Sequence, residues 1–179
     1  ASWTEDDVNR LYESFEKDLY QVVAEYCVPI PGVVETVEKL RGQGLLIGST
    51  TGYNSRMMEQ VLPRAKELGY EADCVVTPDV TGMGRPTPFM LFECMRRMQV
   101  YPPQAVVKVG DTVVTGSNLL GLTEEEYEAM EPEQLKQCKR KAADRYREAG
   151  ADLVIDSIRE LPLAVEEINR RLAKKEAER

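Results

Sequence analysis

The side chains that could do chemistry in this 179-residue chain are limited first by the absence of histidine. Without imidazole, Ser-His-Asp and Cys-His catalysis are excluded, and so are metal sites built on histidine. The four cysteines lie far apart and form no CxxC pair, which argues against a structural thiolate metal site. Any chemistry must therefore use carboxylates, hydroxyls, Lys, Arg, backbone amides or a hard cation.

One candidate site is the run Ser49-Thr50-Thr51-Gly52-Tyr53, which follows a short apolar segment. Hydroxyl groups and a glycine amide in front of a helix can hold a phosphate or phosphonate, because donor groups and the positive end of the helix dipole meet there. The alternative is a helix cap that is simply rich in Ser and Thr. We single out Thr51, Gly52 and Tyr53 as candidate substrate-binding residues.

Two further candidates lie in the loops after later apolar segments. Arg85, between Gly84 and Pro86, could bind an anion through two hydrogen bonds, although most loop arginines are solvated. Asp111 follows Val107-Lys108-Val109-Gly110 and could bind Mg²⁺, which prefers oxygen ligands, or could be an ordinary turn aspartate. The three motifs together are more specific than any one of them.

The elements that would position these residues alternate between short apolar strands and amphipathic helices. Four strands are expected, over 45–48, 74–77, 105–109 and 152–156. Helices are expected over 4–26, 33–40, 57–68, 87–99, within 123–150 and from about 162, and Pro63 is expected to kink or end the third of them. This alternation predicts an α/β fold with a doubly wound parallel sheet, whose loops at the carboxyl ends of the strands share one crevice.

Composition excludes several classes of protein. The chain has 23 Lys and Arg against 31 Asp and Glu, a net charge of −8, so no broad surface for nucleic acid or anionic membrane is expected. No apolar run approaches the roughly 20 residues needed to cross a bilayer, and the first residues are neither basic nor apolar. These features predict a soluble, cytoplasmic protein.

The motifs in this order resemble the phosphonoacetaldehyde hydrolase family of the haloacid dehalogenase superfamily. The resemblance covers most of the chain and rests on the helix from Thr4 to Tyr26 and on these runs: Leu46–Tyr53, Val76–Asp79, Gly84–Pro86, Lys108–Thr112, Gly116–Asn118 and Gly121–Glu126. It implies a Rossmann-type core over 29–179, with residues 1–28 forming the last helix of a small helical cap. It also implies a homodimer formed through the cap.

The activity that the resemblance implies is hydrolysis of the carbon–phosphorus bond of phosphonoacetaldehyde to acetaldehyde and phosphate, assisted by Mg²⁺. In that family a cap lysine forms a Schiff base with the aldehyde, and an aspartate takes the phosphoryl group covalently. By position, Thr51 and Arg85 would be catalytic, Thr51, Gly52, Tyr53 and Arg85 would bind substrate, and Asp111 would be a metal ligand.

The sequence departs from the family pattern in two places. It starts after the strand that carries the nucleophile and after the cap helices that carry the Schiff-base lysine. After Asp111 it passes directly from Val113-Val114 to Thr115-Gly116-Ser117, without the family's second acid and one βα unit. Two alternatives therefore stay open: a non-catalytic module that folds, dimerises or binds anions, and a phosphate-monoester phosphatase of the same superfamily.

Overall fold

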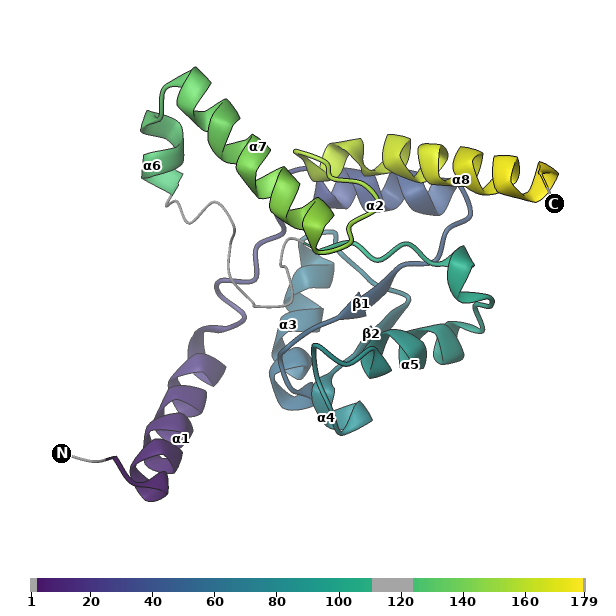
Figure 1. Ribbon diagram of the computed structural model, residues 1–179. Helices are drawn as coiled ribbons and strands as arrows, with labels where there is room; N and C mark the ends of the chain where they lie inside the picture. The colour runs from purple at the N-terminus through teal and green to yellow at the C-terminus, as the bar shows by residue number, and fades with distance from the viewer. Residues whose placement is uncertain (1–2, 111–123, 179) are drawn as a thin grey trace. The chain divides into compact units, whose positions relative to one another are not determined.

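The computed structural model describes residues 3–110 and 124–178, which divide at residue 100 into two compact units (Figure 1). The first unit contains helix α1 (Glu5–Val22), α2 (Val33–Gly42), strand β1 (Gly48–Thr50), α3 (Ser55–Glu67), β2 (Cys74–Val76), α4 (Pro78–Thr81) and α5 (Phe89–Met98). The second contains the short 3-10 helix η1 (Pro103–Ala105), α6 (Glu124–Ala129), α7 (Pro132–Glu148), η2 (Ile158–Glu160) and α8 (Leu161–Ala177).

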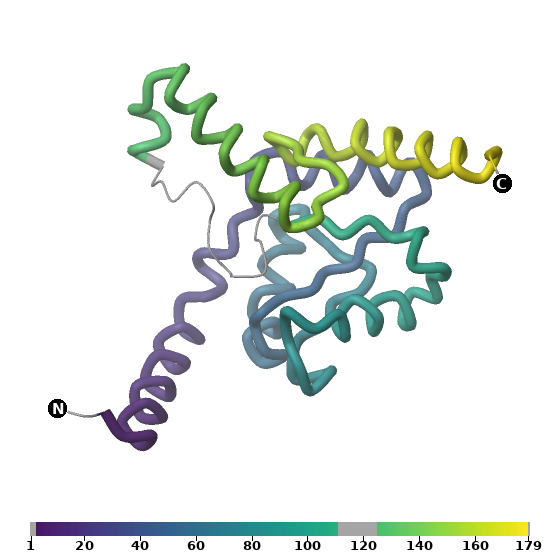
Figure 2. Tube along the Cα trace, viewed as in Figure 1, coloured from purple at the N-terminus to yellow at the C-terminus, as the bar shows by residue number. Residues whose placement is uncertain are grey.

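The first unit is built on a parallel pair of strands, β1 and β2, joined by helix α3. Gly48 pairs with Cys74, and Thr50 pairs with Val76. A parallel pair needs a crossover connection, and Figure 2 follows the chain from β1 through α3 back to β2. Both strands consequently end at the same edge, where the predicted binding loop begins.

The core of this unit lies between the sheet and α5. Cys74 and Val76 point to one face of β2, because side chains alternate along a strand, and there they pack with Met90 and Cys94 of α5. Val76 is fully buried, and Met98 of α5 comes so close to Gly48 that a Cβ there would lie 2.9 Å from the methionine Cε. The apolar spacing of α5 in the sequence thus corresponds to its packing on the strands.

Two sequence expectations differ from the structure. Helix α3 does not end at Pro63 but continues to Glu67, with Met57, Met58 and Ala65 buried on one side. Proline removes one backbone hydrogen bond, and the buried face on both sides of it offsets that loss.

The other difference concerns the third and fourth expected strands. Residues 105–109 and 152–156 are described but have no strand structure, so the sheet within the described residues has the two strands β1 and β2 rather than a doubly wound set. The first of these segments is apolar in sequence, yet its side chains are not buried: Val107 and Val109 are 37% and 40% exposed. A strand exists only when a neighbour accepts its backbone hydrogen bonds, and these segments have no such ladder in the described residues.

The second unit is helical and has a small interior. Its buried side chains among the described residues are Ala142 of α7 and Pro162 and Val165 of α8. Helix α7 begins at Glu131 without a side-chain cap, whereas α1 begins with a capping box between Thr4 and Asp7. None of the described helices combines the length and apolar character that a bilayer crossing requires.

Candidate functional site

The candidate site begins at the carboxyl end of β1, where the chain turns from the strand into α3. The amide of Thr51 donates to the carbonyl of Val76 at 3.4 Å, which holds the turn against β2. The amide of Tyr53 donates to Thr51 Oγ1 at 3.1 Å. The Thr51 oxygen accepts this bond and keeps its own proton to donate, as a phosphate-binding hydroxyl requires.

The first turn of α3 is held by side chains of the protein itself. Asn54 caps the helix, because its Oδ1 accepts from the amide of Met57 at 2.9 Å. The amide of Ser55 donates to Asp79 Oδ1 at 3.0 Å. Since these two amides already have partners, an anion at this place would be bound mainly by Thr51 and Gly52 in the turn before the helix.

Asp79 and Thr77 connect the loop after β2 to the same turn. Thr77 is buried, and its Oγ1 lies 2.9 Å from the hydroxyl oxygen of Ser55. Hydrogen bonds from the side chains of Ser55 and Thr77 hold the pKa of the Asp79 carboxyl below its ordinary value of 3.8. Asp79 therefore stays ionised and orders the site. The sequence alone does not single out this aspartate as a site residue, and its spatial pairing with Ser55 is what reveals the contact.

Arg85 reaches the same turn from a distant part of the sequence. Gly84 packs against Pro78, where a Cβ on the glycine would lie 3.4 Å from the proline Cβ. A Cβ on Gly52 would lie 3.4 Å from Arg85 Nη2. The structure therefore brings Arg85 beside the Thr51–Tyr53 turn, with its guanidinium exposed and available to an anion.

The predicted metal ligand Asp111 lies outside the described residues. Within 3–110 and 124–178, no three Asp, Glu, Cys or His side chains are grouped closely enough to hold a metal ion. Asp79 and Asp73 already accept protein hydrogen bonds, the latter from the amide of Ile47 at 2.7 Å. The described donors at the strand ends are cationic or hydroxylic, which suits an anion.

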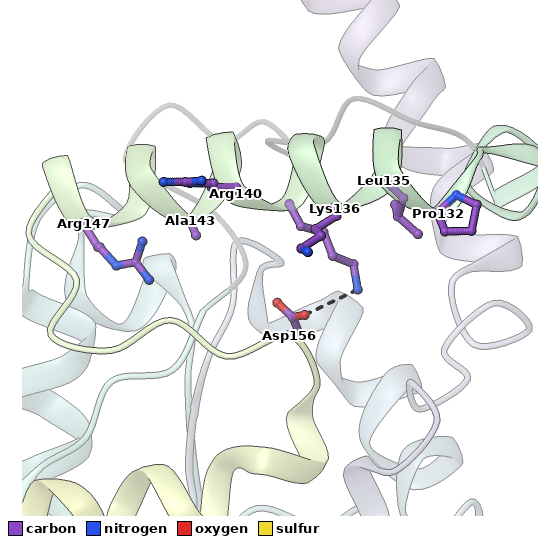
Figure 3. Close-up of a pocket in the computed structure, with 8 residues that line it drawn as sticks. Pro132, Leu135, Lys136, Arg140, Ala143, Arg147 and Asp156 are labelled. Carbon is purple, nitrogen blue, oxygen red and sulfur yellow. Dashed lines mark ion pairs between the residues drawn. The ribbon is translucent and has the colours of Figure 1, made fainter.

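A separate hollow of about 570 Å³ lies along α7 (Figure 3). Lys139 Nζ lies 3.5 Å from Asp156 Oδ2 and 5.7 Å from the centroid of the Tyr127 ring. The hydrogen bond with Tyr127 and the charge of Asp156 raise the pKa of Lys139 above its ordinary value of 10.5. Attack on an aldehyde needs a neutral amine, and these contacts favour the protonated form of Lys139, so they do not point to it for the Schiff-base step.

Lysines 66 and 108 do not fit that step either. Lys66 forms an ion pair with Glu71 at 2.7 Å, and Lys108 donates to the carbonyl of Val109 at 2.6 Å. Both amines are thereby engaged by oxygen acceptors on the protein.

Comparisons with known proteins show what the chain is similar to. A family model described as haloacid dehalogenase-like hydrolase matches residues 2–116. A phosphonoacetaldehyde hydrolase of Bacteroides fragilis is 45% identical over 187 residues, which cover 96% of this chain and 71% of the relative. One of Parabacteroides distasonis is 42% identical over 185 residues, with coverages of 94% and 70%.

A solved structure is similar as well. The crystal structure of a phosphonoacetaldehyde hydrolase-like protein from Oleispira antarctica superposes with a TM-score of 0.86 at 31% identity, and the match covers 97% of this chain and 69% of that one. On these matches of sequence and fold, the chain belongs to the phosphonoacetaldehyde hydrolase family of haloacid dehalogenase-like hydrolases.

Proposed function

We propose that this protein acts in the hydrolysis of the carbon–phosphorus bond of phosphonoacetaldehyde to acetaldehyde and phosphate, and that Thr51, Gly52, Tyr53 and Arg85 bind the phosphonate group. The observation that carries the proposal is the approach of Arg85 Nη2 to Gly52 beside the hydroxyl of Thr51. The names of the bacterial relatives support the choice of substrate.

The chemistry of the phosphonate explains why these residue types occur together. Its oxygens carry negative charge, so a planar guanidinium can pair with two of them while the Thr51 hydroxyl donates to the third. Gly52 has no Cβ, which lets the substrate approach the backbone amide closely. These contacts would stabilise the charge on the phosphoryl oxygens as the bond to carbon breaks.

The electron pair of the broken bond needs an acceptor. In the proposed route a Schiff base between a lysine and the aldehyde takes up that pair as an enamine, an aspartate receives the phosphoryl group, and water then releases phosphate. The contribution of the described residues is to bind and orient the phosphonate. We further propose that Asp111 holds Mg²⁺, which would supply positive charge to the phosphoryl oxygens. Titration of Mg²⁺ into the Asp111→Asn variant should show weaker binding than in the unaltered protein.

Helix α1 supports the proposed role of residues 1–28 as the last helix of a cap. None of its residues is buried, and Leu11, Tyr12 and Phe15 are each more than half exposed. An apolar face of this kind is typical of a surface that another helix covers, which agrees with a homodimer formed through the cap. The molar mass measured by light scattering after size-exclusion chromatography would test this. A monomer at micromolar concentration would contradict the homodimer.

The test of the function compares phosphonoacetaldehyde with a simple phosphate monoester, and follows acetaldehyde and phosphate release together with binding of inorganic phosphate. Arg85→Ala should weaken phosphate binding about 10- to 100-fold, because it removes charge-assisted hydrogen bonds. Arg64→Ala is the matched control, since Arg64 is an exposed arginine of the same unit that pairs with Glu67 at 3.0 Å.

Each alternative has its own outcome in this experiment. Turnover of the monoester alone would indicate a phosphatase. Phosphate binding without turnover of either substrate would indicate an anion-binding module. An equal effect of the two arginine variants would show that Arg85 does not bind the anion.

A further inference from the structure

We propose that Tyr20 of α1 and Asn54 of α3 are positioning residues that tie helix α1 to the phosphonate-binding turn. The inference rests on the proposed function and adds a route by which the position of α1 sets the geometry of that turn. Its basis is one amide side chain that contacts both helices at once.

The Asn54 amide contacts both helices, and the Tyr20 hydroxyl of α1 lies within hydrogen-bond distance of both its Oδ1, at 3.2 Å, and its Nδ2. Its Oδ1 accepts from the amide of Met57 and so caps α3. Its Nδ2 donates to the Tyr20 hydroxyl at 3.0 Å and to Glu16 Oε1 at 3.2 Å, both on α1. Capping needs only the oxygen, and Ser, Thr or Asp would provide one. Asn brings in addition a separate amide nitrogen, which donates the bond to Glu16 while the oxygen caps the helix.

Other contacts reinforce this attachment. The Arg56 guanidinium lies 4.7 Å from the centroid of the Tyr20 ring, a cation–π contact from the first turn of α3. Val23 is buried, and the Cys27 thiol lies 3.9 Å from the carbonyl of Val61 in α3. A hollow of about 390 Å³, lined by residues of α1 together with Arg56, lies at the same place. Helix α1 is thus held on α3 through its second half and the segment after it.

The residue that contacts α1 is next in sequence to the candidate site. Asn54 follows Tyr53 in the chain, and the amide of Tyr53 is held by the Thr51 hydroxyl. A shift of α1 must either break the bonds to Asn54 or rotate its side chain, and rotation would also release the cap on Met57. Rotation would therefore disturb the turn that is proposed to bind the phosphonate, and loss of the bonds to α1 would leave Asn54 with fewer restraints beside it.

The experiment compares Tyr20→Phe with Tyr26→Phe. The first variant keeps the ring over Arg56 and removes only the hydroxyl, and the second removes a hydroxyl from a tyrosine that is 76% exposed. Loss of one hydrogen bond should raise the dissociation constant for inorganic phosphate about 3- to 10-fold in Tyr20→Phe. It should also speed hydrogen exchange of the amides of residues 52–55 in the phosphate-free protein. Tyr26→Phe should leave both measurements unchanged.

Two further measurements separate positioning from simple loss of stability. Phosphate should slow amide exchange in residues 16–20 of the unaltered protein but not of Tyr20→Phe. Asn54→Ser keeps a capping hydroxyl and is too short to reach Tyr20, so adding Tyr20→Phe to it should produce no further loss of affinity.

The possible failures are distinguishable. If Tyr20→Phe matches Tyr26→Phe in phosphate-free exchange and in affinity, the positioning role is overturned even though the proposed function stands. If the unaltered protein does not bind phosphate, the proposed function fails, and phosphate-free exchange at residues 52–55 still decides whether Tyr20 orders the turn.

Discussion

The two units of the chain use the same alternation of short apolar runs and amphipathic helices with different results. In the first unit, 48–50 and 74–76 pair as parallel strands and bury Val76 and Met90 beneath α5. In the described part of the second unit, 105–109 and 152–156 carry a similar pattern and form no strand. The difference shows that helix signals act locally, whereas a strand signal takes effect only where a partner strand is available.

The largest expected loss of stability comes from a substitution in the core between the sheet and α5, which distinguishes the first unit. Met90 is 2% exposed, and Met90→Ala should lower the free energy of unfolding by about 2–4 kcal/mol through lost burial and the cavity left behind. Urea denaturation followed by circular dichroism measures this. Leu163→Ala in the second unit, where the side chain is 64% exposed, is the control and should change stability by less than about 0.5 kcal/mol. Equal losses would mean that the burial of Met90 does not account for its contribution to stability.

A smaller effect is expected at the N-terminus of α3. Asn54→Ala removes the oxygen that caps Met57 and should cost about 1–2 kcal/mol of stability. Thr4→Ala removes a comparable cap from α1, whose side chains are not buried, so it should reduce helicity at residues 5–8 with little effect on the urea midpoint. A similar shift of the midpoint in both variants would contradict this distinction.

A gain of stability is expected at α7, which lacks the kind of cap that α3 has. Glu131→Asp places a shorter carboxylate at the N-cap and should stabilise the helix by about 0.5–1 kcal/mol. Hydrogen exchange of the amides of residues 133–136 should slow. Glu148→Asp, at the other end of α7, is the control and should not slow them.

The smallest effect concerns a motif that the two units share. Hydrogen bonds from Arg96 and Arg97 lower the pKa of Glu93 from 4.5 to about 2, and bonds from Arg171 and Arg170 likewise lower that of Glu167. A carboxyl whose pKa is depressed in the folded state contributes stability above its unfolded pKa and loses it as the pH falls through the folded value. Glu93→Gln should therefore flatten the loss of thermal stability between pH 4.5 and pH 2.

Because the arginines that pair with these half-buried carboxylates are exposed, the change should be slight, and the unaltered protein measured at neutral pH and high salt gives the reference. Glu167→Gln should behave alike in the second unit. A steeper acid loss in either variant would contradict the assigned direction of the pKa shift.

Much of the fold follows from local signals in the sequence. The helices α1, α5 and α8 lie close to their predicted ranges because spacing, caps and breakers are encoded within each segment. The helix over 57–68 was predicted, but whether it would end at Pro63 was not, since that depends on what Met57, Met58 and Ala65 pack against. The same dependence on neighbours explains the two expected strands that do not form.

Some features of the candidate site likewise follow from local sequence, and others depend on contacts between distant residues. The Thr51–Tyr53 turn and Arg85 were predictable because both follow apolar runs, and residues after strands commonly bind ligands. The bond between Asp79 and Ser55 and the contacts of Asn54 with Tyr20 were not predictable, because they join residues 24 and 34 positions apart. The prediction for Asp111 falls outside the described residues and stays a prediction.

The reaction rate of the buried thiols of the first unit can report on opening of its core. Desolvation and the neighbouring Cys74 raise the pKa of Cys94 to about 12, so its reactive thiolate is scarce while the core is closed. Cys27 and Cys138 are partly exposed. A thiol reagent should therefore modify these two first, and the later reaction of Cys94 and Cys74 reports how often α5 lifts from the sheet, without any label added to the chain.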